Sequence, residues 1–241
     1  MQSELTKKLR EKFFKFRRRV FHLMKKKRVT VGGIRLISDR TIVPKDIVKY
    51  LYDDSYEQDE RILVEKYLKE GDRVLEIGAG IGLVSLTCAR IVGVDNLLSY
   101  EPNKRTQDII RQNFALNNLT PQLRNKAIAL NAGQIEFFIS DNVISSSLID
   151  RNLDQRQLIE CDSMADVLAE FLPNVLVMDV EGAEVELLGQ SDLSTVDKIV
   201  VEVHPHVVGA DEVARMVSKL ADKGFLLNEE QGQCHMYVKR Q

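Results

Sequence analysis

Carboxylates and a histidine follow two apolar, β-prone stretches of this 241-residue chain. The stretch at residues 175–180 ends within Asp179-Val-Glu181-Gly182-Ala-Glu184, and the stretch at residues 196–203 is followed directly by His204. Carboxyl and imidazole groups are the usual carriers of protons in enzyme sites. Because the carboxyl ends of parallel strands meet at one edge of a sheet, we expect Asp179, Glu181 and His204 to share a cleft.

We predict that Asp179 lies nearest the chemistry, that His204 is an alternative base and that Glu181 orients the substrate. Two interpretations without catalysis stay open. Acidic residues near a helix N-terminus stabilise its dipole, and a half-buried imidazole can have a purely structural role. A metal site formed by these three side chains is conceivable, but the carboxylates lack a tight ligand spacing, so we predict no metal.

A glycine-rich loop follows an earlier predicted strand, residues 73–77, and reads Glu76-Ile-Gly78-Ala-Gly80-Ile-Gly82. Glycines let the backbone turn tightly and let a ligand approach it closely. The spacing differs from the G-x-G-x-x-G of dinucleotide sites, and Glu76 would repel a pyrophosphate. The loop with Glu76 therefore favours S-adenosylmethionine over NAD, because Glu76 can bind the cationic amino group of S-adenosylmethionine. A glycine turn needed only for packing is the alternative.

Glu101 supports a nucleoside ligand. It stands at the end of the second predicted strand, residues 96–101, and Pro102-Asn103 opens the next predicted helix. An acidic residue at this place can accept hydrogen bonds from both ribose hydroxyls.

From residue 73 onward, β-prone and helix-prone stretches alternate, which predicts an α/β fold with a mostly parallel sheet, helices on both faces and a C-terminal antiparallel hairpin. The predicted strands are 73–77, 96–101, 122–130, 134–140, 175–180, 196–203, 225–228 and 235–239. The predicted helices are 58–69, 82–90, 104–117, 183–190 and 211–223. Residues 29–37 form a short β-prone stretch broken at Gly32-Gly33, and 38–57 read as irregular. We expect the acceptor pocket to draw on 38–57 and 141–160, with a mobile loop at 145–147.

The first 28 residues differ from the rest of the chain. They hold twelve Lys/Arg and two Glu, a net charge of +10, whereas the remainder has 34 acidic and 22 basic residues. An apolar stripe recurs at helical spacing among the cations. It consists of Leu5, Leu9, Phe13, Phe16, Val20, Leu23 and Met24. This predicts an amphipathic helix that lies on an anionic membrane through residues 5–28, binds nucleic acid, or packs on its own domain or a partner.

Composition limits the class of protein. Hydrophobic residues make up 44% and charged residues 29%, which is typical of a globular domain. The longest apolar runs are far shorter than the roughly 20 residues of a membrane span. Cys88, Cys161 and Cys234 are widely spaced, and we expect three buried thiols in a reducing cytoplasm. A peripheral place at the inner face of the membrane follows if the first helix binds lipid.

Together these motifs resemble the FkbM-type methyltransferases, a branch of the class I S-adenosylmethionine-dependent enzymes. The most specific match is Asp179-Val-Glu181-Gly182-Ala-Glu184, and Val201-Glu202-Val203-His204 closes the series. Further matches include the glycine loop, Tyr100-Glu101-Pro102-Asn103, Asn113 with Asn117, Ala127-Ile-Ala129 and the serines at 145–147. Family members often have Asp and Asn at the positions of Glu76 and Gly80.

The resemblance implies a Rossmann-like class I methyltransferase fold with a seven-stranded sheet of order 3-2-1-4-5-7-6. It also implies methyl transfer from S-adenosylmethionine to oxygen, commonly a sugar hydroxyl of a glycan, glycolipid or glycosylated metabolite. The predicted cofactor-binding residues are Glu76, Gly78, Ala79, Gly80, Gly82, Glu101, Pro102, Asn103, Ala127 and Asp179.

The predicted organisation is a basic amphipathic helix (1–28), an extension that packs on the domain (29–70) and the cofactor-binding domain (71–241). Two other functions stay open: an RNA- or protein-directed methyltransferase, and a non-catalytic membrane or partner scaffold on the same fold. The acidic body disfavours nucleic acid.

Overall fold

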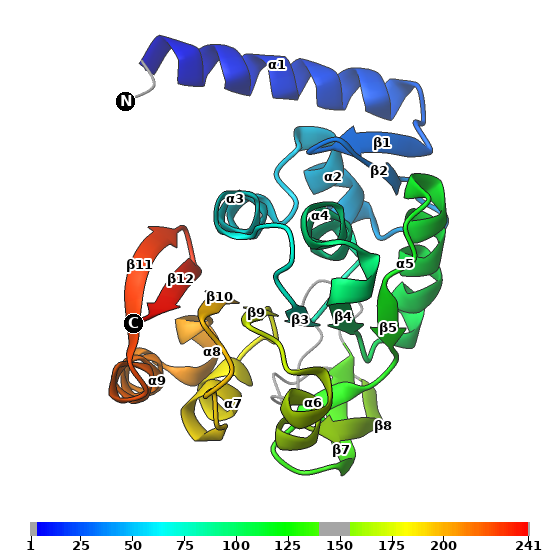
Figure 1. Cartoon of the computed structure of the whole chain (residues 1–241). Helices are drawn as coiled ribbons and strands as arrows, with labels where there is room; N and C mark the ends of the chain where they lie inside the picture. The colour runs from blue at the N-terminus through cyan, green and yellow to red at the C-terminus, as the bar shows by residue number, and fades with distance from the viewer. Residues whose placement is uncertain (1–3, 140–154, 241) are drawn as a thin grey trace.

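A seven-stranded sheet forms the centre of the computed structural model, which describes residues 4–139 and 155–240 (Figure 1). Its order is β11-β12-β10-β9-β3-β4-β5, and β12 pairs antiparallel with both of its neighbours. Numbered along the chain within this sheet, the strands run 3-2-1-4-5-7-6, the order that the resemblance implies. The bounds are β3 Val74–Ile77, β4 Leu97–Tyr100, β5 Gln122–Arg124, β9 Val175–Met178, β10 Lys198–Glu202, β11 Phe225–Gln231 and β12 Cys234–Lys239.

Helices cover both faces of this sheet, as the alternating pattern predicts (Figure 1). One layer contains α3 (Gln58–Tyr67), α4 (Leu83–Val92), the short 3-10 turn η1 (Val94–Asn96) and α5 (Lys104–Asn117). The other contains α6 (Met164–Phe171), α7 (Glu184–Gln190), α8 (Pro205–Val208) and α9 (Ala210–Asp222).

The two central strands, β3 and β9, are buried throughout and apolar except at Glu76, because each faces a helix layer on both sides. Successive side chains of a strand point to opposite faces. Val74 and Val175 therefore belong to the core cluster under α3 and α4, whereas Leu75 and Leu176 belong to the cluster under α6, α7 and α9. All four are fully buried, as is typical of parallel strands.

The segment between β4 and β9 differs from its prediction. The single strand expected over 122–130 is two strands, β5 in the central sheet and β6 (Ala127–Ala129) in a second, three-stranded sheet with β7 and β8. The polar residues between them let the chain leave the central sheet. Strand β7 (Gly133–Ile139) was expected, but β8 (Gln155–Ser163) and α6 were not. The loop expected at 145–147 lies outside the described residues.

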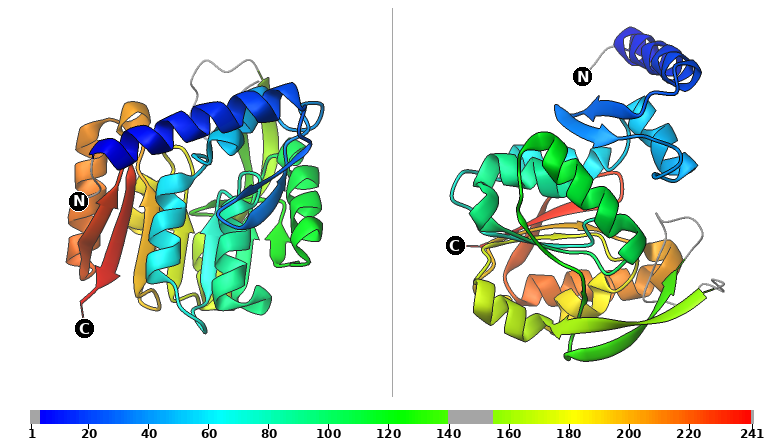
Figure 2. Two further views of the ribbon diagram at one scale, coloured as in Figure 1. Left: turned by 90° about the horizontal axis from the view of Figure 1, so that it is seen from above. Right: turned by 90° about the vertical axis from the view of Figure 1, so that its right-hand side faces the viewer.

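The N-terminal part forms a layer of its own beyond α4 and α5 (Figure 2). It comprises α1 (Glu4–Leu23), the hairpin β1 (Arg28–Val31) and β2 (Ile34–Ile37), and α2 (Lys45–Asp53). Gly32 and Gly33 both have positive φ, at 54° and 78°, so the predicted break is the turn of a hairpin. Reading 38–57 as irregular was wrong, because Ile47, Val48, Leu51 and Tyr52 form the buried face of α2. All three cysteines are buried free thiols.

Asn113 on α5 joins this layer to the glycine loop. It is fully buried, its Oδ1 accepts the backbone N–H of Ile37 at 2.8 Å, and its Nδ2 donates to the carbonyl of Ile81 at 2.9 Å. Asn117, one turn later, bonds both backbone groups of Arg35. A single side chain therefore satisfies two buried backbone groups from segments far apart in the sequence.

We predict that Asn113→Ala lowers the free energy of unfolding by at least about 2 kcal/mol, because it leaves a buried N–H and a buried carbonyl without partners. Urea unfolding followed by circular dichroism measures the change. Gln112→Ala, at an exposed position of the same helix, should stay within about 0.5 kcal/mol of the wild type. Equal stability of the two variants would contradict this role for Asn113.

Candidate active site

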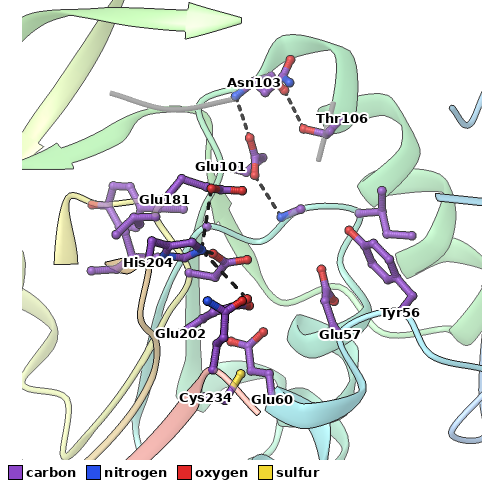
Figure 3. Close-up of a pocket in the computed structure, with 18 of the residues that line it drawn as sticks. Tyr56, Glu57, Glu60, Glu101, Asn103, Thr106, Glu181, Glu202, His204 and Cys234 are labelled. Carbon is purple, nitrogen blue, oxygen red and sulfur yellow. Dashed lines mark hydrogen bonds and ion pairs between the residues drawn. The ribbon is translucent and has the colours of Figure 1, made fainter. Parts of the chain in front are cut away.

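One cavity of about 470 Å³ lies at the carboxyl ends of β3, β4, β9 and β10 (Figure 3). Its wall is formed by the segments that follow these strands, by the beginning of α3 and by the turn before β12. The cavity brings together most of the residues singled out from the sequence: Gly78, Gly80, Glu101, Pro102, Asn103, Ala127, Asp179, Glu181 and His204.

The glycine loop brings the end of β3 against the end of β9. Gly78 has φ +95°, and a Cβ atom there would lie 1.9 Å from the carbonyl oxygen of Asp179. Glycine is therefore required for this approach. The N–H groups of Gly78 and Ala79 both donate to the carbonyl of Tyr100, at 2.9 and 3.1 Å, which ties the loop to β4 as well.

Glu101 holds the loop from the other side. Its Oε2 accepts the N–H of Gly80 at 2.9 Å and its Oε1 accepts the N–H of Asn103 at 2.7 Å. The side chain is 6% exposed, and burial raises its pKa to about 7. Each carboxylate oxygen can accept a second hydrogen bond, so the fixed Glu101 can receive two further donors from a ligand.

Glu184 orients the imidazole of His204. Its Oε1 lies 3.2 Å from His204 Nδ1 and accepts the backbone N–H of His204 at 3.0 Å, while its Oε2 accepts the N–H of Gly182 at 2.7 Å. Glu184 is fully buried and His204 is 3% exposed. This carboxylate–imidazole pair fixes the ring, and His204 Nε2 points to the cavity (Figure 3).

Three more carboxylates surround His204 Nε2. The distances are 3.5 Å to Asp179 Oδ1, 3.7 Å to Glu181 Oε2 and 4.0 Å to Glu202 Oε1. Asp179 and Glu181 both reach His204 because of a turn and not because of strand alternation: β9 ends at Met178, and Glu181 has the left-handed φ of +53°. A non-glycine residue held in that region is strained, which is common at functional sites.

Burial and mutual repulsion keep protons on this cluster. Burial, then the charge of Glu202, raise the pKa of Asp179 to about 8. Burial alone would lower the pKa of His204, but the hydrogen bond that its ring donates to Glu184 and the charge of Asp179 outweigh it and raise the pKa to about 9. The group can therefore both store and release a proton near neutral pH.

The wall of the cavity is strongly acidic. Among the described residues, seven carboxylates line it and Lys126 is the single Lys or Arg. The seven are Glu57, Asp59, Glu60, Glu101, Asp179, Glu181 and Glu202. Such a wall attracts cations and repels phosphates.

One group of side chains in this wall could hold a metal ion. A carboxylate oxygen of Asp179, one of Glu202 and a ring nitrogen of His204 lie within 4.8 Å of one another. Carboxylates also gather in this way around an imidazolium, so the arrangement alone does not make a metal site. The absence of a metal stays a prediction.

Three predicted cofactor residues lie outside the cavity wall. Glu76 is within β3 and not beyond its end, so its side chain points into the domain, where it is 1% exposed and accepts from Ser85 Oγ at 2.5 Å. Ala79 is a buried residue of the loop itself and does not face the cavity. Gly82 packs α4 against α5, since a Cβ there would lie 3.0 Å from Phe114. The expectation that Glu76 touches the ligand is therefore corrected.

Tyr56 and Glu57 line the cavity beside the glycine loop and belong to the segment 38–57, which was expected to contribute to the pocket. Sequence reasoning missed Glu60 on α3, which lines the same cavity (Figure 3). A Cβ on Gly80 would lie 2.8 Å from Glu57 Oε1 and 3.1 Å from the Tyr56 hydroxyl, so these side chains reach the loop closely. The run Glu57-Gln58-Asp59-Glu60 was the available signal, but only the fold brings it to the cavity.

The family model described as "Methyltransferase FkbM domain" matches residues 76–227 of the chain. Among curated proteins, the ribosomal protein L11 methyltransferase of Dictyoglomus thermophilum is 21% identical over 98 residues. These are 41% of this chain and 32% of that protein, so the matched part spans about a third of the relative's length.

Solved structures of low sequence identity are also similar. One is the precorrin-6y C5,15-methyltransferase of Geobacter metallireducens, with a TM-score of 0.48, 14% identity, and coverage of 85% of this chain and 93% of that chain. Another is M. jannaschii TYW2 in complex with AdoMet, with a TM-score of 0.47, 13% identity, and coverage of 89% and 84%.

The raised pKa values predict that the ligand-free protein loses stability as pH rises. Folded Glu101 and Asp179 hold protons up to about pH 7 and 8, whereas the unfolded chain releases them near pH 4. Folded His204 holds its proton to about pH 9, against 6.5 when unfolded. The folded state thus binds more protons than the unfolded state across this range, and the free energy of unfolding falls with pH.

Urea unfolding at pH 5.5, 7 and 8.5 measures this slope. In Glu101→Gln, which removes one titrating carboxyl, the decline between pH 5.5 and 7 should be shallower than in the wild type. Stability that rises with pH over this range would contradict the assignment of raised pKa values.

Proposed function

The chain belongs to the FkbM methyltransferase family, and we propose that it transfers the methyl group of S-adenosylmethionine to a hydroxyl oxygen of a sugar in a glycan, a glycolipid or a glycosylated metabolite. The observation that carries the proposal is the single cavity that joins Glu101 and the glycine loop to the cluster around His204.

The residues present fit the cofactor. Asn103 Nδ2, Glu57 Oε2 and Asp179 Oδ1 are buried atoms for which the described part of the chain supplies no hydrogen-bond partner. In the wall that also contains Glu101, Asn103 offers an amide donor and Glu57 a carboxyl oxygen to the cofactor, whereas Asp179 Oδ1 is left for the acceptor hydroxyl. A ligand that bears ribose hydroxyls, an ammonium group and a sulfonium complements that set, because buried polar atoms require partners.

Glu101 would hold the ribose, since both of its oxygens are already fixed by backbone N–H groups and each retains a lone pair. Asn103 and the backbone at Gly78 and Gly80 would hold the remainder of the nucleoside. Bound S-adenosylmethionine supplies a methyl group on a good leaving group. The chain must then hold the acceptor oxygen in line with that methyl, about 3 Å away.

Asp179 would take the proton of the acceptor hydroxyl as the new bond forms. In its deprotonated form Asp179 is a stronger base than an ordinary carboxylate because its pKa is raised, and the protonated ring of His204, whose Nε2 lies 3.5 Å from Asp179 Oδ1, would stabilise that negative charge. Glu181 would orient the sugar, and Glu184 would keep the imidazole ring in place.

Methylation of RNA or protein is the competing function, because the name of the L11 methyltransferase relative specifies a ribosomal protein. The seven carboxylates of the cavity wall disfavour an acceptor that brings phosphates. A neutral hydroxylated acceptor meets no such repulsion. A non-catalytic scaffold is disfavoured by the buried, oriented cluster around His204, since burying several ionisable groups together lowers stability and a scaffold has no need of them.

We predict that Asp179→Asn lowers kcat by about 100-fold or more, the usual contribution of a general base, while the Kd for S-adenosylmethionine changes by less than about threefold. Asn keeps the shape of the side chain and removes only its basicity. Methyl transfer from labelled S-adenosylmethionine to a panel of hydroxylated glycans measures kcat, and calorimetry measures Kd.

Glu186→Gln is the matched control, because this carboxylate is exposed on α7, a few residues further along the chain. It should behave as the wild type. Full turnover by Asp179→Asn would show that Asp179 is not the base. Methyl transfer to RNA or protein, with none to any glycan, would contradict the sugar acceptor.

A further inference from the structure

Helix α1 is held to the body by one face only. Arg18 pairs with Asp53 at 2.7 Å, Arg17 donates to the carbonyl of Thr30 at 3.0 Å, and the ring of Phe21 meets that of Tyr52 edge-on with centroids 5.5 Å apart. These contacts join α1 to α2 and to the β1–β2 hairpin. Helix α1 is the outermost element of its side of the molecule in Figure 1 and in the right-hand view of Figure 2.

The apolar stripe lies on the opposite face. Its side chains at Phe13, Phe16, Leu23 and Met24 are 60%, 66%, 84% and 61% exposed, and Val20 is partly buried. By the 3.6-residue period, Arg18 lies across the helix from the centre of this stripe, and Arg17 and Phe21 lie at its border. The stripe is therefore not the surface that packs α1 on its own domain, which was one of the sequence-based alternatives.

Basic side chains border the stripe. Lys12, Lys15 and Arg19 are exposed along the same side of α1, and Lys25 to Arg28 continue beyond its end. A second copy of the helix would bring these cations against one another, so self-association through the stripe is disfavoured. An anionic surface complements them.

A groove of about 530 Å³ between α1 and α2, here called the basic groove, gives an independent observation. Arg19, Arg40, Lys45 and Lys49 line it, and Asp46 is the single acidic residue on its wall within the described chain. Leu23 belongs both to the groove and to the apolar stripe, so the two surfaces are continuous. A groove of this charge suits phosphate groups.

We infer that α1 docks the protein on an anionic phospholipid surface, with the apolar stripe at the level of the acyl chains and the basic groove against lipid phosphates. An amphipathic helix with apolar and cationic faces binds membranes in this way. Within the described residues no helix is long and apolar enough to cross a bilayer, so the contact is with the surface.

Helix α2 connects this surface to the active site. Tyr52 and Asp53 contact α1, whereas Ile47 and Tyr50 of the same helix line the cavity. Docking would place the cavity near the lipid surface, with α2 between the cavity and α1. A lipid-linked glycan is presented at such a surface. This consequence rests on the proposed function, whereas the docking itself does not.

Co-sedimentation of the full-length protein with vesicles tests the docking without any turnover. The wild type should bind vesicles of phosphatidylglycerol and phosphatidylcholine and stay in solution with phosphatidylcholine alone. Two triple variants should each weaken binding by at least about tenfold. The stripe variant is Phe13→Ser, Phe16→Ser, Leu23→Ser, and the groove variant is Arg19→Gln, Lys45→Gln, Lys49→Gln.

The matched controls change the same chemistry elsewhere. Leu226→Ser with Leu227→Ser alters exposed leucines on β11, and Lys69→Gln, Arg111→Gln, Lys219→Gln removes three exposed cations away from α1. Both should bind as the wild type, and thermal melting should show every variant folded.

The proposal is overturned if the wild type fails to bind anionic vesicles or if the stripe and groove variants bind as well as the controls. It is also overturned if sedimentation velocity shows a dimer that the stripe variant dissolves and vesicles do not bind. Vesicle binding by a protein inactive on glycans would leave the docking standing and remove only the proposed acceptor.

Discussion

The active site depends on the contact between the end of β3 and the end of β9. A Cβ atom on Gly78 would lie 1.9 Å from the carbonyl oxygen of Asp179, so only glycine permits this approach. The approach places the loop that is suited to a nucleoside directly beside the carboxylate that is suited to take a proton. Glu101 then fixes the loop through Gly80, and Glu184 fixes His204 on the far side of Asp179. The loop suited to a nucleoside and the carboxylate suited to take a proton are thus adjacent because of backbone packing at Gly78.

The electrostatics of the cavity oppose the stability of the domain. Several carboxylates are held close together and largely away from water, which raises the pKa of Glu101 and of Asp179. Glu181, in the same cluster, has a left-handed backbone, which is a strained conformation for a residue other than glycine. Buried groups of this kind are kept where chemistry requires them. A cationic ligand in the cavity relieves the repulsion, so cofactor binding and folding stability are coupled. Asn113 joins the hairpin to the glycine loop, and the core cluster that the hairpin and α2 share with Ala79 and Ile81 offsets part of this cost.

Local sequence was sufficient for those parts of the site that follow directly from a strand. Gly78, Glu101, Asp179 and His204 each stand at the end of an apolar stretch, and the alternating pattern predicts that such ends meet. Glu76 was misplaced because it stands inside β3, where strand alternation turns its side chain to Ser85. The carboxylates at the beginning of α3 could not be assigned, because their place is set by tertiary packing of a segment that precedes the first strand of the sheet. For the same reason the sequence suggested the apolar stripe of α1 but not the direction in which it faces.

The central claim is that this cavity binds S-adenosylmethionine with Glu101 on its ribose. Calorimetric titration of the purified protein, alongside Glu101→Ala and the control Glu186→Ala, tests it most directly. We expect binding in about the micromolar range for the wild type and the control, and its loss in Glu101→Ala. Absence of heat and of any thermal shift in the wild type, or equal affinity of Glu101→Ala and the wild type, would contradict it.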